Sequence, residues 1–283
     1  EDDMMRMVWC LLAVGLLGLS TNQLHAGSAP RGGNLQVLGE ARNKLIPIAL
    51  EGFFGEVAGV LKFDLEVMGC KVVPLADAAF VVRGKADGSV VGALTDKAGN
   101  PGFNRRYSGG NLRDQAHALS NDVIQALTGV PGIASTRVLF KMKAGPRAEE
   151  VFLSDYDGHK PVALTNDKTL VSAPRWSPDH SKVFYTTWLK RGGIENTTVI
   201  QQNMKTGERE VMARYRGLNT GGALSPQGFL AMILSRGGSP DVYVAPPGWK
   251  FMEDLKGQNL RRMCVTREEE NGVTWSPDGQ WLC

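Results

Sequence analysis

Hydrophobic residues recur along this chain with two different periods, and the change between them lies near residue 135. Between about residues 35 and 132, apolar residues at steps of three and four predict two amphipathic helices. The first helix has its apolar positions at Phe54, Val57, Leu61, Leu65 and Met68. Gly69 is expected to end this helix, because glycine readily adopts the left-handed conformation that follows a helix C-terminus.

A second helix is predicted to begin after Asn111, whose side chain can cap the first turn, and to end at Thr128-Gly129. Apolar runs bounded by turn residues predict strands at 45–50, 78–84 and 90–94. Helices and strands alternate over this part of the chain. The pattern therefore predicts a small α/β domain of about 100 residues.

From about residue 137 the helical period ends and a sequence repeat begins. The copies are 172–180, 220–228 and 271–279, and their Ser-Pro pairs, 48 and 51 residues apart, begin at Ser177, Ser225 and Ser276. An apolar strand pattern follows each turn, as at 182–185 and 229–234. A repeat of this length is typical of β-propeller blades, so we predict an α+β N-terminal domain followed by an all-β propeller.

Turn geometry explains the repeated motif. Proline fixes φ near −65° at the second turn position, aspartate supplies a side-chain hydrogen bond, glycine supplies the positive φ, and tryptophan packs between blades. We therefore interpret Ser177, Asp179 and Asp278 as turn residues and not as catalytic groups. Altered turns are expected where the repeats depart from the pattern, at His180, Leu224 and Gln227.

The first 26 residues predict an export signal rather than a part of the fold. Arg6 precedes the apolar run 8–19, which is too short to cross a bilayer about 30 Å thick. Residues 1–26 are therefore predicted to be a cleaved signal peptide, with an uncleaved membrane anchor as the alternative. The predicted domains are then 27–135, with an extended leading segment, and 136–283.

Charge and short motifs exclude several classes of function. The net charge is +3, from 32 basic and 29 acidic residues without a basic run, which argues against nucleic-acid binding. No G-x-S-x-G, H-E-x-x-H, glycine-rich phosphate loop or paired C-x-x-C motif occurs, so we predict no catalytic residue, no cofactor and no metal site. The run 155–158 is interpreted as a β-turn and not as the start of a calcium loop. Cys264 and Cys283 could form a disulfide, although unpaired thiols are favoured.

Three histidines follow the predicted signal peptide and its cleavage point. His117 lies on the second predicted helix beside Arg113, where we predict a packing or hydrogen-bonding role rather than catalysis. His159 and His180 follow turn residues and are expected to be exposed.

Several segments resemble one protein family. The stretch 107–122, which contains the helix start Leu112-Arg113 and the pair Ala116-His117, is similar to the "LR-x-x-AH" helix of the TolB family. The exit Leu127–Gly132 is similar to that family's "LTG-x-x-G". The stretch 151–158, followed by Trp-Ser-Pro repeats, resembles the start of the family's propeller. The chain is identified on these motifs as a member of the TolB family, the periplasmic component of the Tol-Pal system.

The resemblance implies a six-bladed propeller, whereas this sequence holds about two to two and a half blades. It ends at 281–283, inside the strand expected after the third Ser-Pro turn. An open partial ring would expose a strand edge and an apolar blade face. We therefore expect the sequence to be a C-terminally truncated piece of a longer protein.

The resemblance also implies a non-enzymatic binding protein, expected to be a periplasmic monomer that supports outer-membrane integrity, protein import and cell division. The family's propeller mouth receives the peptidoglycan-associated lipoprotein Pal. On the Ser-Pro alignment, the corresponding residues here are Leu218, Asn219, Thr220, Gly221, Asn271, Gly272, Ser172 and Ala173. The family's N-terminal segment engages the inner-membrane protein TolA, and the matching residues here are Leu35, Gln36, Val37 and Leu38.

Two other interpretations stay open on the sequence. Similar repeats occur in propellers attached to prolyl-oligopeptidase-like hydrolases, whose catalytic domain would then be missing from this sequence. A generic ligand-binding propeller that does not bind Pal would have similar blades. Ordinary turn sequence is an equally good explanation of the eight predicted Pal-contact residues.

Overall fold

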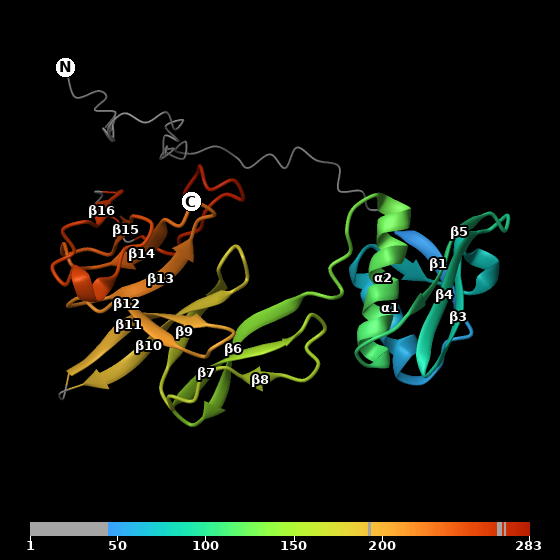
Figure 1. Ribbon diagram of the computed structural model, residues 1–283, viewed down its shortest axis with the longest axis horizontal. Coiled ribbons are helices and arrows are strands. Elements are labelled where there is room, and N and C mark those ends of the chain that lie inside the picture. Colours follow the sequence, from blue (N-terminus) through green and yellow to red (C-terminus); the bar gives the residue numbers. More distant parts are fainter. Residues whose placement is uncertain (1–44, 192–193, 265–267, 269) are drawn as a thin grey trace, which may run out of the picture. The chain divides into compact units, whose positions relative to one another are not determined.

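The structure is a computed structural model that describes residues 45–283 except 192–193, 265–267 and 269 (Figure 1). Its contacts divide the described chain into two compact units. We call them the helical unit (residues 45–140 and 152–164) and the blade unit (residues 141–151 and 165–283). The predicted signal peptide, residues 1–26, and the segment Leu35–Leu38 lie outside the described residues. In the described part, no helix is both long and apolar enough to cross a membrane.

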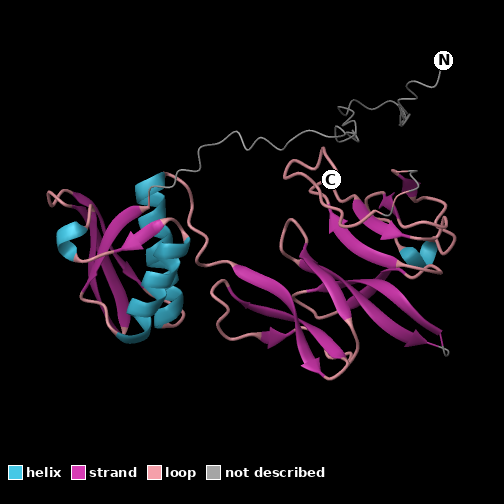
Figure 2. Cartoon of the chain, turned by 180° about the vertical axis from the view of Figure 1, so that it is seen from behind, coloured by secondary structure: helices cyan, strands magenta, loops and turns pink. Residues whose placement is uncertain are grey.

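The helical unit is a five-stranded sheet with both helices on one face (Figure 2). Its strand order is β2-β1-β3-β4-β5, with parallel pairing of β1 to β2 and β3 and antiparallel pairing from β3 to β5. The elements are β1 (Ile46–Glu51), α1 (Gly55–Val67), β2 (Cys70–Val72), η1 (Leu75–Asp77), β3 (Phe80–Asp87), β4 (Ser89–Asp96), β5 (Pro101–Tyr107) and α2 (Leu112–Thr128). The predicted mixture of helices and strands is confirmed.

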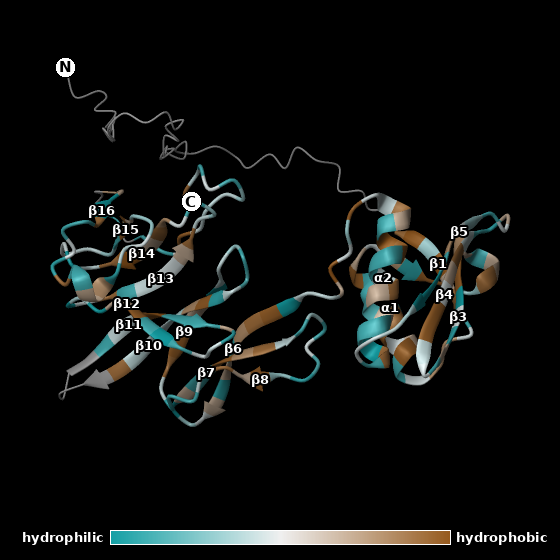
Figure 3. Cartoon of the chain, in the orientation of Figure 1, coloured by the Kyte–Doolittle hydropathy of each residue, from teal (hydrophilic) through white to brown (hydrophobic). Residues whose placement is uncertain are grey.

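Two strands of this sheet were not predicted, for identifiable reasons. β2 has only three residues, too few to show a period, and β5 carries mostly exposed polar residues at the sheet edge. Both helices carry hydrophilic as well as hydrophobic residues (Figure 3). Their apolar sides pack on the sheet, and the core contains Ile48, Leu61, Leu65, Val82, Val90, Leu119 and Val123. Gly92 on β4 permits this packing, because a Cβ there would lie 2.6 Å from Leu119 Cδ1.

The helix ends follow the sequence signals. The Asn111 side chain accepts from the Asp114 N–H at 2.9 Å, and the Asp114 carboxylate accepts from the Asn111 N–H at 3.1 Å. This reciprocal pair is a capping box that satisfies two backbone donors. Gly129 and Gly69 have φ of 74° and 94°, the left-handed conformation expected after a helix C-terminus. The predicted ends of both helices and the predicted start of the second are therefore confirmed. Phe54, expected among the apolar positions of the first helix, instead precedes it as the N-cap residue and is 83% exposed.

The blade unit contains two consecutive four-stranded antiparallel sheets, and each runs in simple meander order from an inner to an outer strand. The first comprises β9 (Val171–Trp176), β10 (Lys182–Arg191), β11 (Ile194–Asn203) and β12 (Arg209–Ala213). The second comprises β13 (Asn219–Leu224), β14 (Leu230–Leu234), β15 (Asp241–Ala245) and β16 (Arg261–Arg262), with η2 (Phe251–Glu253) between the last two strands. A three-stranded sheet of β6 (Arg137–Gly145), β7 (Ala148–Asp155) and β8 (Val162–Ala163), whose residues are divided between the two units, precedes them in the chain.

The two four-stranded sheets bury a shared apolar layer. Phe184 and Val199 from the first sheet pack with Met232, Leu234 and Tyr243 from the second, and all five are at most 8% exposed. The second sheet's other face also carries apolar residues, which pack with Val273 and Trp275 of the third repeat. Successive sheets joined face to face in this way are propeller blades, which confirms the predicted fold class.

The three Ser-Pro turns adopt one geometry. In each, the N–H of the fourth residue donates to the serine carbonyl, at 2.9 Å for His180 and Gly228 and at 2.8 Å for Gly279. The Asp179 carboxylate accepts from the hydroxyls of Ser177 and Ser181, and these bonds lower its pKa to about 2. The interpretation of these residues as turn chemistry is therefore supported by their hydrogen bonds.

The departure at His180 does not alter this turn. His180 has φ of 57°, where Gly228 and Gly279 have 88° and 67°. A left-handed conformation costs a residue with a Cβ on the order of 1 kcal/mol. The histidine ring packs edge-on against Trp176, with 6.0 Å between the ring centroids, and this contact offsets part of the cost.

Replacing His180 with glycine is therefore expected to stabilise the blade unit by about 0.5 kcal/mol. The free energy gained by relieving the backbone strain exceeds the sum of two losses, the ring contact with Trp176 and the greater conformational entropy of the unfolded chain. Guanidinium unfolding followed by tryptophan fluorescence measures this change. The reciprocal substitution Gly228→His is the matched control and should destabilise the unit. A His180→Gly variant that is clearly less stable than the parent would contradict the strain argument.

Candidate partner-binding site

Three consecutive repeats bring the predicted Pal-contact residues together at the start of the inner strands. We call this surface the inner-strand entrance and define it by Ser172, Ala173, Leu218, Asn219, Thr220, Gly221, Asn271 and Gly272. Thr220 Oγ1 lies 3.1 Å from Thr186 Oγ1, and Thr186 pairs with Ser172 across β9 and β10. A Cβ added to Gly221 would lie 3.3 Å from Val273 Cγ1, so the second and third repeats are also in contact.

Asn219 supports this entrance from below its surface. Its side chain is fully buried, its Nδ2 donates to the carbonyls of Thr197, Tyr215 and Gly217 at 2.8–3.0 Å, and its Oδ1 accepts from the Tyr215 N–H at 2.7 Å. All the polar groups of this amide are thus used within the fold. Asn219 therefore holds the loop 215–219 in shape and offers no free group to a partner.

Leu218 and Thr220 flank this anchor and stay half-buried. The Leu218 N–H donates to Ser235 Oγ at 2.7 Å, and the Leu218 carbonyl accepts from the Ser235 N–H at 3.0 Å. The Leu218 side chain packs on the apolar cluster that contains Val273. These contacts fix the position of both residues, which lowers the entropic cost of binding a partner there.

The inner strands begin with bulges that need unusual backbone angles. Ala173 has φ of 51°, and Gly221 and Gly222 have 90° and 95°. Each register shift lies beside one of these positions. Only a residue with little or no side chain tolerates such angles cheaply, which explains the Gly221-Gly222 pair.

Asn271 and Gly272 form the exposed part of the entrance. Both are exposed, and Gly272 has φ of 69°. Among the described residues, none makes a hydrogen bond with the Asn271 side chain. Asn271 therefore presents an unused amide two residues before Val273, which belongs to the apolar cluster on which Leu218 packs.

Sequence reasoning missed the residues that hold the entrance in place. Thr186, Thr197, Tyr215 and Ser235 lie on other strands or loops and bond to it through single hydroxyl or backbone groups. None belongs to the repeated motif. The only signal available was the small polar character of Thr186, Thr197 and Ser235, which is too common to identify a role.

The helical unit holds a buried charged cluster formed by two of the sequence motifs. His117 Nδ1 donates to Asp64 Oδ2 at 2.8 Å, and His117 Nε2 lies 3.8 Å from Asp157 Oδ2. Arg113, one turn before His117 on α2, pairs with Asp157 and with Glu56. Arg113 and His117 thus tie the turn 155–158 to α2, and the predicted hydrogen-bonding role of His117 is confirmed.

This cluster has the residue types of a metal site. Asp64, His117 and Asp157 each offer a ligand atom, and the three atoms lie within 4.8 Å of one another. The Arg113 guanidinium, however, already occupies the Asp157 oxygen that faces His117. Its permanent positive charge disfavours a dication at the same oxygen, so the donor set fits an ion-pair network better than a metal centre.

The other titratable residues singled out in the sequence have structural surroundings. Gly158, with φ of 81°, closes a turn in which its N–H donates to the Asp155 carbonyl at 2.9 Å. The expected exposure of His159 is wrong, because the residue is half-buried; its backbone N–H donates to Asp157 Oδ1 at 3.0 Å. His180 is exposed, as expected. Cys264 and Cys283 are not joined, so the disulfide that the sequence left open is absent between them.

The meander sheets, their Ser-Pro turns and the preceding α/β unit define the chain as a β-propeller protein with an N-terminal α/β domain. The TolB beta propeller domain family matches residues 124–283, more than half of the chain. The chain belongs to this family. The family named from the sequence motifs is thereby confirmed.

Individual relatives agree with this assignment. The chain is 28% identical over 254 residues to the Tol-Pal system protein TolB of Nitrosomonas europaea, which covers 77% of this chain and 56% of that protein. It is 35% identical over 112 residues to the protein of the same name from a Marinomonas species, covering 38% of this chain and 25% of that protein. The matched part of the chain thus spans just over half of the Nitrosomonas protein and a quarter of the Marinomonas protein.

A solved structure shows the same fold. The crystal structure of TolB from Acinetobacter baumannii superimposes with a TM-score of 0.69 at 23% identity, and the match covers 83% of this chain and 64% of that one. At this identity the similarity supports the architecture, and the function has to be argued from the site.

Proposed function

We propose that this chain is the non-enzymatic, periplasmic protein-binding part of a Tol-Pal-like cell-envelope system. In this proposal, the inner-strand entrance docks a Pal-like peptidoglycan-associated lipoprotein, and the protein supports outer-membrane integrity and cell division. Membership of the TolB family supports the system, and the preorganised entrance supports the location of the docking surface. We also propose that the two domains, 27–135 and 136–283, meet near residue 135.

One observation carries the location of the binding surface. The half-buried Leu218 and Thr220 are held by bonds to Ser235 and Thr186, and Asn271 presents a free amide in the exposed segment that precedes Val273. A rigid apolar and hydroxyl surface with an unused polar group is suited to bind a protein, because few groups have to be ordered on association.

We also propose that the leading segment of the mature chain, with Leu35–Leu38, engages a TolA-like inner-membrane protein. This part of the proposal rests on the family resemblance alone. The segment lies outside the described residues.

Substituting Asn271 with arginine is expected to weaken binding of the purified Pal-like lipoprotein at least tenfold. A long cationic side chain at an exposed contact position blocks close approach without a large effect on folding. The measurement is biolayer interferometry of the mature protein, completed from its own reading frame, against the lipoprotein of the same organism. Leu218→Arg is a second variant with the same expected loss of binding.

Gln258→Arg is the matched control, because Gln258 is also an exposed amide and lies outside the entrance. It should bind like the parent. Tryptophan fluorescence of every variant confirms that the blade unit is folded. Failure of the parent protein to bind, or unchanged binding by Asn271→Arg and a folded Leu218→Arg, would leave a propeller whose ligand is not a Pal-like protein.

A further inference from the structure

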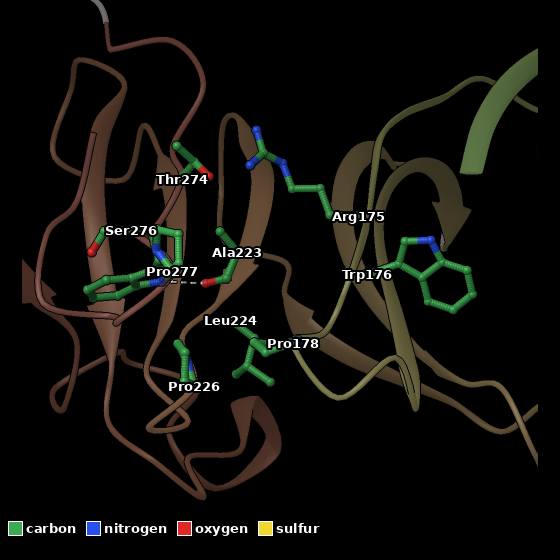
Figure 4. A pocket seen from close by; sticks show the side chains of 10 residues that line it. Arg175, Trp176, Pro178, Ala223, Leu224, Pro226, Thr274, Ser276 and Pro277 are labelled. Carbon is green, nitrogen blue, oxygen red and sulfur yellow. Dashed lines mark hydrogen bonds between the residues drawn. The ribbon is translucent and has the colours of Figure 1, made fainter. Parts of the chain in front are cut away.

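A pocket lies at the other end of the inner strands, where the three Ser-Pro turns begin (Figure 4). It has a volume of about 300 Å³ and is lined by residues that end β9 and β13 and by Thr274–Pro277 of the third repeat. β13 leads from the inner-strand entrance at Asn219 to this pocket at Leu224, a span of about 17 Å at 3.3 Å per strand residue. The pocket and the proposed Pal-binding surface are therefore separate sites.

One cation dominates the polar part of this pocket. Arg175 is half-buried, and no hydrogen bond or ion pair joins its side chain to another described residue. Figure 4 shows this side chain extending towards Thr274, whose hydroxyl also has no partner among the described residues. No aspartate or glutamate lines the pocket. The nearby carboxylates of Asp179 and Asp278 accept hydrogen bonds within their own turns. An unpaired guanidinium in a partly desolvated pocket favours an anionic ligand.

The walls of the pocket are apolar and fixed. Leu224, Pro178 and Pro226 line one part, and Trp275 lines another. The indole of Trp275 is held because its Nε1 donates to the Ala223 carbonyl at 2.9 Å, as the dashed line in Figure 4 shows. The indole of Trp176 points away from these side chains in the same view. A ligand would thus need an apolar group beside its anionic group.

We propose that this pocket binds the C-terminal carboxylate of a peptide whose last side chain is apolar. Arg175 pairs with the carboxylate through its forked N–H donors, and the Thr274 hydroxyl adds a further hydrogen bond. The last side chain packs on Leu224, Pro226 and Trp275. A volume of about 300 Å³ holds roughly one residue with its carboxylate, which is the small end of the range for ligand pockets.

The test compares two peptides that differ in one group. An acetylated tripeptide ending in leucine is titrated as the free acid and as the C-terminal amide, with binding followed by tryptophan fluorescence and by calorimetry. The acid is expected to bind at least tenfold more tightly than the amide, because only the acid carries the charge that Arg175 pairs with. Equal binding of acid and amide, or no binding of the acid at millimolar concentration, would overturn the proposal.

Variants assign the effect to the pocket. Arg175→Gln should abolish the preference for the acid, and Arg175→Lys should restore part of it. Lys205→Gln, an equal loss of charge at an exposed turn of the blade unit, should leave the preference unchanged. A preference that survives in Arg175→Gln, or that Lys205→Gln removes to the same extent, would show that the carboxylate is not bound by this guanidinium. Pal-lipoprotein binding, measured in parallel, should be unaffected by Arg175→Gln.

Discussion

Replacing Arg113 with methionine is expected to lower the free energy of unfolding of the helical unit by about 3 kcal/mol. Among the described residues, Asp157 pairs with the Arg113 guanidinium and lies near His117, and no other cation contacts it. The Asp157 side chain is only 5% exposed. Removing a partner from a buried ion pair leaves a charge without compensation, which costs roughly 3–5 kcal/mol. Asp64, fully buried beside His117, adds a second carboxylate to the same cluster.

Far-UV circular dichroism measures this loss selectively, because both α-helices of the described chain lie in the helical unit. Arg105→Met is the matched control: it removes an arginine that pairs with Asp122 of α2, but the Arg105 side chain is 58% exposed. Exposed ion pairs contribute about 0–1 kcal/mol, so the control should unfold almost like the parent. Equal effects of the two substitutions would show that burial of the cluster does not decide its energy.

The second large effect is expected for Asn219→Asp, which should destabilise the blade unit by at least about 3 kcal/mol at neutral pH. The amide nitrogen at this position donates to three carbonyl oxygens. A carboxylate would place a negative charge against those oxygens in a fully buried position, and it could donate to none of them. Tryptophan fluorescence during guanidinium unfolding reports this loss, since every described tryptophan lies in the blade unit.

The pH dependence gives the same prediction a second test. Burial raises the pKa of the introduced carboxyl above its unfolded value, so the variant is expected to lose stability as pH rises from 5 to 8. Asn271→Asp is the matched control, because its side chain is exposed and should change stability by less than about 0.5 kcal/mol. A stable Asn219→Asp variant would mean that the Asn219 hydrogen bonds do not hold the entrance loop.

If Asn219→Asp loses stability at neutral pH and loses more as the pH rises, Asn219 acts as a support for the binding surface and not as a part of it. Binding experiments would then separate the two roles. An entrance substitution that leaves stability unchanged, such as Asn271→Arg, tests contact with a partner. A substitution at Asn219 tests the shape of the loop instead.

The sequence by itself determined the local elements and the repeat. The apolar period of α1 and α2, the cap at Asn111 and the glycines at 69 and 129 predict both helices, because these signals act within a few residues of one another. The Ser-Pro spacing predicts the blades for the same reason, since each turn is fixed by residues adjacent in the chain. The family motifs on α2 and at 155–158 could likewise be read without a structure.

Only the tertiary structure decided how these local pieces are used. The sequence shows Arg113, His117 and Asp157 as parts of separate motifs, and their buried ion pairing depends on residues about 40 to 50 positions apart. Asn219 reads as an ordinary turn residue, and its four hydrogen bonds arise because loops from two strands meet around it. The unpaired Arg175 is recognisable only once the third repeat closes the pocket beside it. Long-range packing, which no local period records, therefore determined which polar residues are buried supports and which remain free to bind.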